Sequence, residues 1–212
     1  MLQEISYRGG RIVGPVLLHF LILNIVQMIR LHGDAAFLTT MAAVIVLPLF
    51  VKMMKSDGRW EGPAEGWRQA LPSPGKISLI ILGALFCNLV LTAIVDQIAA
   101  GFHLSNTVQE GLFAGNPVIL LAGIGLIVPI EEEVLFRGLV YNRLRDYNRT
   151  WLSVFFTSLL FAGYHGNLIQ ILFAFPMSLI ITALYEKERM LWAPVLFHMT
   201  VNLSSVVITM MS

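Results

Sequence analysis

Long apolar runs separated by short polar segments dominate this chain. A helix needs about 20 mostly apolar residues to cross the hydrocarbon core of a membrane. The pattern therefore predicts an all-α fold, a polytopic membrane bundle of about seven transmembrane helices. The stretches that reach or approach the required length are residues 13–28, 35–53, 77–99, 117–139, 151–165, 168–185 and 190–211.

The connection between the fifth and sixth stretches consists of Gly166 and Asn167 alone. Such a short link predicts a tight antiparallel helical hairpin. The sixth stretch contains Pro176, which we expect to kink its helix and to open space nearby.

Lysine and arginine positions predict the orientation. If the N-terminus is cytoplasmic, most of the 14 basic residues fall on the cytoplasmic side, as the positive-inside rule requires. Arg30 would then face outward, and Arg137 lies within a stretch. The cytoplasmic set is Arg8, Arg11, Lys52, Lys55, Arg59, Arg68, Lys76, Arg143, Arg145, Arg149, Lys187 and Arg189.

Composition supports a bilayer rather than water as the main solvent. The 212 residues are 57% hydrophobic and 13% charged, against about 25% charged in a soluble domain, and the mean hydropathy is +0.76. A net charge of +1 gives no reason to expect a nucleic-acid partner. We expect one multi-pass domain of the cell membrane across residues 1–212, with the lipid bilayer as its surroundings.

Three consecutive glutamates interrupt the fourth stretch. A carboxylate inside a membrane span costs about 2.5–3.5 kcal/mol on insertion scales, so it persists where something pairs with it or uses it. Residues four apart share a helix face, which predicts an ion pair between Glu133 and Arg137. Glu132 points about 100° away and is free to act, and Glu131, turned a further step, has no assigned role.

Two later stretches carry His165 and His198, and Asn202 follows His198 on the same helix face. Counted from the cytoplasmic ends, Glu132, His198 and His165 lie roughly 15, 12 and 22 Å deep, so tilt and bending would let them converge. Glu132 could take a proton from water, a histidine could hold that water or carry the proton, and His198 with Asn202 could stabilise an oxyanion. His19 in the first stretch is expected to make a packing hydrogen bond or to lie at the membrane interface.

The motifs around these residues resemble those of the CPBP family, which includes the CAAX prenyl endopeptidases and the bacterial Abi proteins. The first motif, Glu-Glu-x-x-x-Arg, is matched within Pro129-Ile-Glu-Glu-Glu-Val-Leu-Phe-Arg-Gly138, the second by Phe161-Ala-Gly-Tyr-His165, and the third by His198-Met-Thr-Val-Asn202. Each motif alone is weak, but all three in order, on separate stretches within residues 117–202, are specific.

The resemblance implies an intramembrane glutamic endopeptidase that hydrolyses a peptide bond with an activated water. It implies that Glu132 and His165 activate the water, that His198 and Asn202 form the oxyanion hole, and that Glu133 and Arg137 support the site. No metal or other cofactor is expected, and the substrate is a peptide or a membrane protein.

Two alternatives stay open. The protein could be a non-catalytic membrane scaffold or a bacteriocin-immunity protein that uses the same fold. Alternatively, the two histidines and a glutamate could bind zinc in a zinc-dependent intramembrane protease, although the chain has no His-Glu-x-x-His motif. The identity of the substrate, its prenylation and the oligomeric state cannot be predicted from the sequence.

Overall fold

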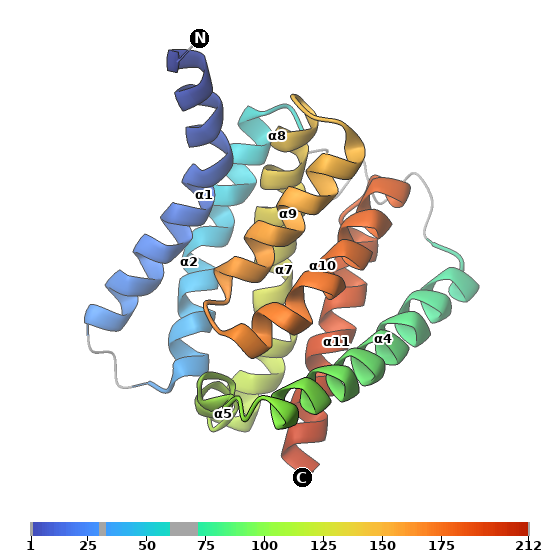
Figure 1. The fold of residues 1–212 in the computed structure, drawn as a ribbon. Coiled ribbons are helices and arrows are strands. Elements are labelled where there is room, and N and C mark those ends of the chain that lie inside the picture. The colour runs from blue at the N-terminus through green and yellow to red at the C-terminus, as the bar shows by residue number, and fades with distance from the viewer. Residues whose placement is uncertain (1, 30–32, 60–71, 212) are drawn as a thin grey trace.

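A computed structural model describes residues 2–29, 33–59 and 72–211, and in these ranges the chain is helical with no strand (Figure 1). The predicted all-α fold is therefore confirmed. Arg30 and Arg68 of the predicted charge pattern lie outside the described residues. The helices other than the glutamate-bearing one are α1 (Leu2–Met28), α2 (Ala35–Ser56), α4 (Pro74–Gly101), α5 (Thr107–Phe113), α9 (Thr150–Tyr164), α10 (Leu168–Glu188) and α11 (Trp192–Met211).

The glutamates lie on a continuous helix over Pro117–Arg145, here called the glutamate helix. It winds alternately as α- and π-helix, a feature that is frequent at functional sites. Its segments are α6 (Pro117–Ile119), η1 (Leu120–Ile127), α7 (Val128–Glu133), η2 (Val134–Tyr141) and α8 (Asn142–Arg145).

The seven predicted stretches all correspond to helices, but the number of spans stays a prediction. Five of the described helices are long and apolar enough to cross a membrane. The glutamate helix makes a sixth only when it is joined to α5, which meets it at an angle of 105°. The helix α9 has 15 residues and is shorter than the others. The sequence did not predict α5, which lies in the segment between the third and fourth stretches.

Local sequence sets several helix boundaries. The side chain of Asp34 accepts a hydrogen bond from the backbone N–H of Phe37 and begins α2. Asn167 accepts from the N–H of Ile169 at the start of α10. Gly166 before it has φ +66°, in the left-handed region that favours glycine. The predicted hairpin between α9 and α10 therefore forms through a glycine turn and an asparagine cap.

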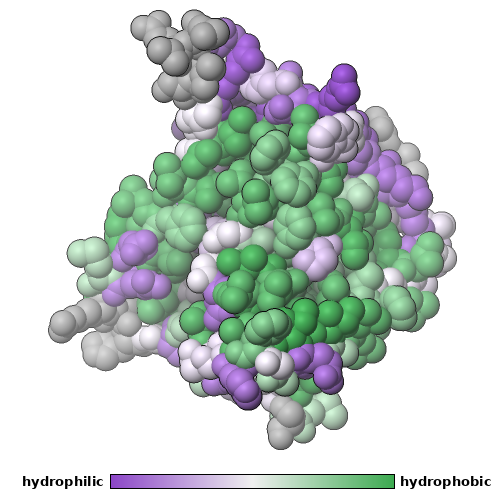
Figure 2. All heavy atoms as spheres, viewed as in Figure 1, coloured by the Kyte–Doolittle hydropathy of each residue, from purple (hydrophilic) through white to green (hydrophobic). Residues whose placement is uncertain are grey.

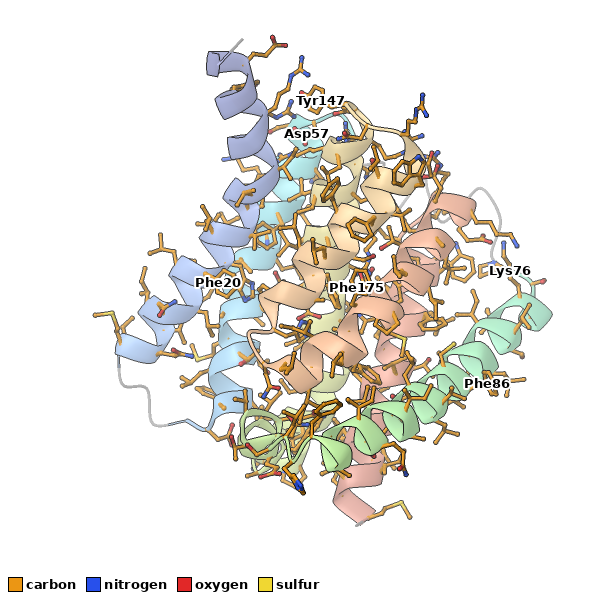
Figure 3. The ribbon with its side chains drawn as sticks, viewed as in Figure 1. Phe20, Asp57, Lys76, Phe86, Tyr147 and Phe175 are labelled. Carbon is orange, nitrogen blue, oxygen red and sulfur yellow. The ribbon has the colours of Figure 1, made fainter. Side chains whose placement is uncertain are left out.

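The two chain ends point to opposite ends of the bundle (Figure 1). At the end nearer the N-terminus, Asp57 bridges two helices, with Arg11 and Arg143 each 2.7 Å from one of its carboxylate oxygens. Asp57 and Tyr147 both lie there in Figure 3. Lys76 also pairs with Glu188, which ties the start of α4 to the end of α10. We call the end of the bundle that carries Arg11, Asp57 and Arg143 the basic end.

The glutamate helix packs closely against α2 and α11 because it has glycines at the contacts. A Cβ atom on Gly123 would lie 2.0 Å from Thr40 Oγ1 of α2, and one on Gly125 would lie 2.5 Å from Leu203 Cδ2 of α11. Large apolar side chains cover much of the outer surface shown in Figure 2. On α4, Leu79 and Phe86 are 71% and 67% exposed, and Phe86 points outward in Figure 3. Such a surface suits lipid, and the protein is a multi-pass membrane protein.

Candidate active site

A cavity of about 460 Å³ lies between the helices of the bundle. Glu132 of α7, His165 directly after α9, and His198 and Asn202 of α11 all contribute to its lining. Three separate parts of the chain thus bring to one cavity the four residues that the sequence analysis selected. Apolar side chains from α10, including Ala174 and Met177 on either side of Pro176, form part of the wall. The expected kink at Pro176 stays a prediction.

Glu133 and Arg137 form the predicted ion pair. The distance from Arg137 Nη1 to Glu133 Oε1 is 2.8 Å, and both side chains are fully buried. Arg137 Nη2 also donates a hydrogen bond to Ser178 Oγ of α10 at 2.8 Å. Because a buried charge is stable only when it is paired and hydrogen-bonded, this pair fixes the glutamate helix against α10.

His198 lies between two carboxylates. Its Nδ1 is 2.7 Å from Glu133 Oε1, and its Nε2 is 3.5 Å from Glu132 Oε2. A carboxylate paired with Arg137 accepts hydrogen bonds, so Nδ1 carries the hydrogen and donates it to Glu133. The ring is therefore held in one orientation, with Nε2 directed toward Glu132.

His165 is oriented by its own helix. Its Nδ1–H donates to the backbone carbonyl of Phe161 at 2.9 Å. In neutral histidine this tautomer leaves Nε2 as an acceptor. His165 therefore has a ring nitrogen that is suited to taking up a proton.

Phe161, the first residue of the second motif, connects the charged residues by packing. Its ring centroid is 5.0 Å from that of His165 and 5.8 Å from that of His198. The guanidinium of Arg137 lies 4.8 Å from the same ring, on its face. One aromatic side chain thus packs against both histidines and the arginine.

Asn202 is held by a backbone carbonyl of the glutamate helix. Its side-chain amide donates to the oxygen of Ile124 at 3.0 Å. In η1 the N–H of Val128 bonds five residues back, to Gly123. The next residue, Pro129, has no N–H, so the carbonyl of Ile124 has no helical partner and accepts from Asn202 instead. The amide of Asn202 retains a second hydrogen for another acceptor.

Glu131 has a partner that the sequence did not predict. Its Oε1 is 3.0 Å from Nδ1 of His19 in α1, and both side chains are buried. The hydroxyl of Tyr164 bonds the other ring nitrogen of His19. The expected packing hydrogen bond of His19 is confirmed, and it belongs to a buried chain of three side chains beside the cavity. The signal in the sequence was one histidine in the first stretch and one glutamate without a partner.

No group of three His, Cys, Asp or Glu side chains within the described ranges is placed to hold a metal ion. The zinc hypothesis stays an alternative that metal analysis must test. The arrangement itself offers a carboxylate, an imidazole acceptor and amide hydrogens around one buried space, which are the groups needed to activate water and to stabilise an oxyanion.

Comparison with known proteins agrees with the motifs. Residues 114–204 match the family described as type II CAAX prenyl endopeptidase Rce1-like. The segment that carries the motifs is thus similar to this family. This confirms the resemblance to the CPBP family.

Three curated relatives match part of the chain. "Putative membrane peptidase YdiL" of Bacillus subtilis is 23% identical over 41% of this chain and 35% of its own length. An uncharacterised 24.3 kDa protein of Escherichia coli is 37% identical over 39% of this chain and 40% of its own. UPF0177 protein YaiF of Lactococcus lactis is 28% identical over 50% of this chain and 46% of its own. The matched regions thus span less than half of each relative, and no solved structure matches the chain.

Proposed function

We propose that this protein is an intramembrane endopeptidase in which Glu132 activates a water molecule for hydrolysis of a peptide bond. The observation that carries the proposal is the shared cavity of Glu132, His165, His198 and Asn202. The similarity of residues 114–204 to the Rce1-like family and the name of the Bacillus subtilis relative support the same class of activity.

The first step uses the carboxylate and the neutral imidazole. Glu132 takes a proton from water, and the resulting hydroxide attacks the carbonyl carbon of the substrate. The neutral ring of His165 then accepts this proton from Glu132 through Nε2 and gives it to the leaving amine. No covalent intermediate with the protein forms, and the water supplies the hydroxyl of the new carboxyl group and the hydrogen of the new amine.

The oxyanion of the tetrahedral intermediate needs donors on its other side. The second amide hydrogen of Asn202 is one donor, because its first hydrogen bonds Ile124. His198 is the other when it carries hydrogens on both nitrogens, since its Nδ1–H already donates to Glu133. Glu133 and Arg137 touch no substrate in this scheme and position His198.

A Glu132→Gln variant tests the mechanism, because it keeps the size of the side chain and removes the base. We expect cleavage to fall by about 10²-fold or more, while the purified variant keeps its elution volume and melting temperature. Peptides that differ between cells with the wild-type protein and cells with the variant would identify substrates. Glu4→Gln is the matched control, because Glu4 is exposed near the start of α1 and remote from the cavity.

Each other outcome points to a different function. Wild-type cleavage by Glu132→Gln would refute the assignment of the base. Full rescue of a deletion phenotype by an inactive variant would favour the scaffold or immunity hypothesis. Stoichiometric zinc, with activity lost to a chelator and restored by metal, would favour the zinc-dependent protease. A prenylated tail and an unmodified peptide are both substrates that this experiment would detect.

A further inference from the structure

The cavity reaches the protein surface at the end of the bundle opposite the basic end. The lining residues that are exposed are Gln27 near the end of α1, Ala35 at the start of α2, Thr92 and Asp96 toward the end of α4, and Val108 in α5. These segments lie in the half of the molecule that contains α5, away from the N-terminus (Figure 1). We call this region the mouth end.

The mouth end and the basic end differ in charge. No lysine or arginine occurs between Lys76 and Arg137, the part of the chain that contains most of α4, α5 and the start of the glutamate helix. The described lining of the cavity contains no lysine or arginine either. At the basic end, by contrast, Arg11 and Arg143 both pair with Asp57. Lys76, at the start of α4, forms a separate ion pair with Glu188.

Charge asymmetry of this kind orients a membrane protein. Segments rich in lysine and arginine stay on the cytoplasmic side, which places the basic end in the cytoplasm and the mouth end outside. We propose that the cavity opens on the extracytoplasmic side and that its substrate is an extracytoplasmic segment of a membrane-associated peptide or protein. The claim that a substrate enters the cavity rests on the proposed function. The claim that the cavity opens on the extracytoplasmic side does not.

The charges at the mouth indicate which charge the entering segment of the substrate carries. Asp96 is exposed at the opening and Glu132 lies inside, so the path carries carboxylates and no fixed positive charge among the described lining residues. A free carboxyl terminus would meet like charge on this path. At the opening, a neutral or cationic segment is therefore favoured over an anionic one.

A matched pair of serine-to-cysteine variants tests the direction of the opening. Ser105, between α4 and α5, is exposed beside the mouth, and Ser56, at the end of α2, is exposed at the basic end. Each becomes cysteine in a chain whose native Cys87 is replaced by alanine. Intact cells are then treated with a membrane-impermeant maleimide, and permeabilised cells serve as the control for reactivity.

We expect the maleimide to label Ser105→Cys in intact cells and Ser56→Cys only after permeabilisation. The reverse pattern, labelling of both variants in intact cells, or labelling of neither until permeabilisation would each overturn the extracytoplasmic opening. This measurement needs no catalytic activity, so it can succeed or fail independently of the proposed function.

The position of cleavage tests the substrate class. We expect the sites that depend on Glu132 to map to extracytoplasmic segments, and sites in cytoplasmic tails would overturn the inference even if proteolysis is confirmed. A bulky impermeant maleimide on Ser105→Cys should also cause loss of cleavage in intact cells. Unchanged cleavage on a fully labelled protein would show that substrates enter by another route. If no site depends on Glu132, the proposed function fails, while the labelling result still reports the direction of the cavity.

Discussion

Each of the three consecutive glutamates has a different environment, because successive residues on a helix point in different directions. Glu131 bonds His19 of α1, Glu132 faces the cavity, and Glu133 bonds both Arg137 and His198. A carboxylate that is enclosed by partners is suited to positioning, whereas one that faces a cavity is available to a substrate. Neighbours in the sequence therefore differ in their surroundings because they point in different directions.

The bond between Glu131 and His19 should stabilise the fold. We expect His19→Leu to lower the free energy of unfolding by about 1–3 kcal/mol, because it leaves a buried carboxylate without a hydrogen-bond donor. The melting temperature of the purified protein in detergent measures the loss.

A double variant controls for the volume and packing of the histidine ring. His19→Leu with Glu131→Leu removes both partners, so it should recover most of the loss of the single variant. Losses that simply add in the double variant would contradict a role for the hydrogen bond.

At the scale of helices, the glutamate helix depends on close approach and on irregular winding. Its π-helical segments flank α7 on both sides, and Pro129 frees the carbonyl that holds Asn202. Glycines at the contacts with α2 and α11 let the backbones approach, so the site is held by two neighbouring helices at once. A bundle with bulkier side chains at these positions would separate the helices that carry the cavity residues.

A methyl group on Gly123 tests this packing. We expect Gly123→Ala to destabilise the protein by about 1–3 kcal/mol, since the new Cβ would meet Thr40 Oγ1 at 2.0 Å. Adding Thr40→Ala should restore part of the stability by removing that oxygen. Gly83→Ala, in α4, has no atom within 4 Å of its new Cβ and should be neutral or slightly stabilising. Equal losses in Gly123→Ala and Gly83→Ala would argue against the contact.

For the whole molecule, the basic end joins the start of the chain to its middle. Asp57 connects Arg11 of α1 with Arg143 of α8. Burial acts to raise the pKa of Asp57, but the hydrogen bonds and charges of Arg143 and Arg11 outweigh it and hold the pKa below its usual value. A carboxyl whose pKa is lower in the folded state stabilises the fold above its unfolded pKa of about 3.9, and this contribution disappears as the pH falls through the folded value.

The stability of the wild-type protein should therefore fall with acidity partly through this site. Asp57→Asn should lower the free energy of unfolding by about 1–3 kcal/mol at neutral pH and should weaken the loss of stability between neutral pH and the pKa of Asp57. Melting temperatures measured over this range give both quantities. Asp146→Asn is the control, because Asp146 pairs with Arg59 at a more exposed position, where an ion pair contributes about 0–1 kcal/mol. The same dependence of melting temperature on pH in Asp57→Asn and in the wild type would refute the role of this residue.

The sequence by itself determined the features that depend on neighbours along the chain. The lengths of the apolar runs predicted the helices, the four-residue spacing predicted the pair of Glu133 with Arg137, and the order of the motifs predicted the residues that line the cavity. The helices and the ion pair follow from helix periodicity and from the cost of exposing polar groups to lipid, which are local properties. The residues chosen from the order of the motifs rest on the resemblance to a known family.

The tertiary structure decided which residues far apart in the sequence contact one another. Glu131 meets a histidine 112 residues away, and Asn202 bonds a carbonyl 78 residues away. The bend between α5 and the glutamate helix and the position of the cavity mouth likewise depend on how the helices pack. Periodicity gives the direction of a side chain on its own helix, but the neighbouring helix that it faces is set by the packing of the whole bundle.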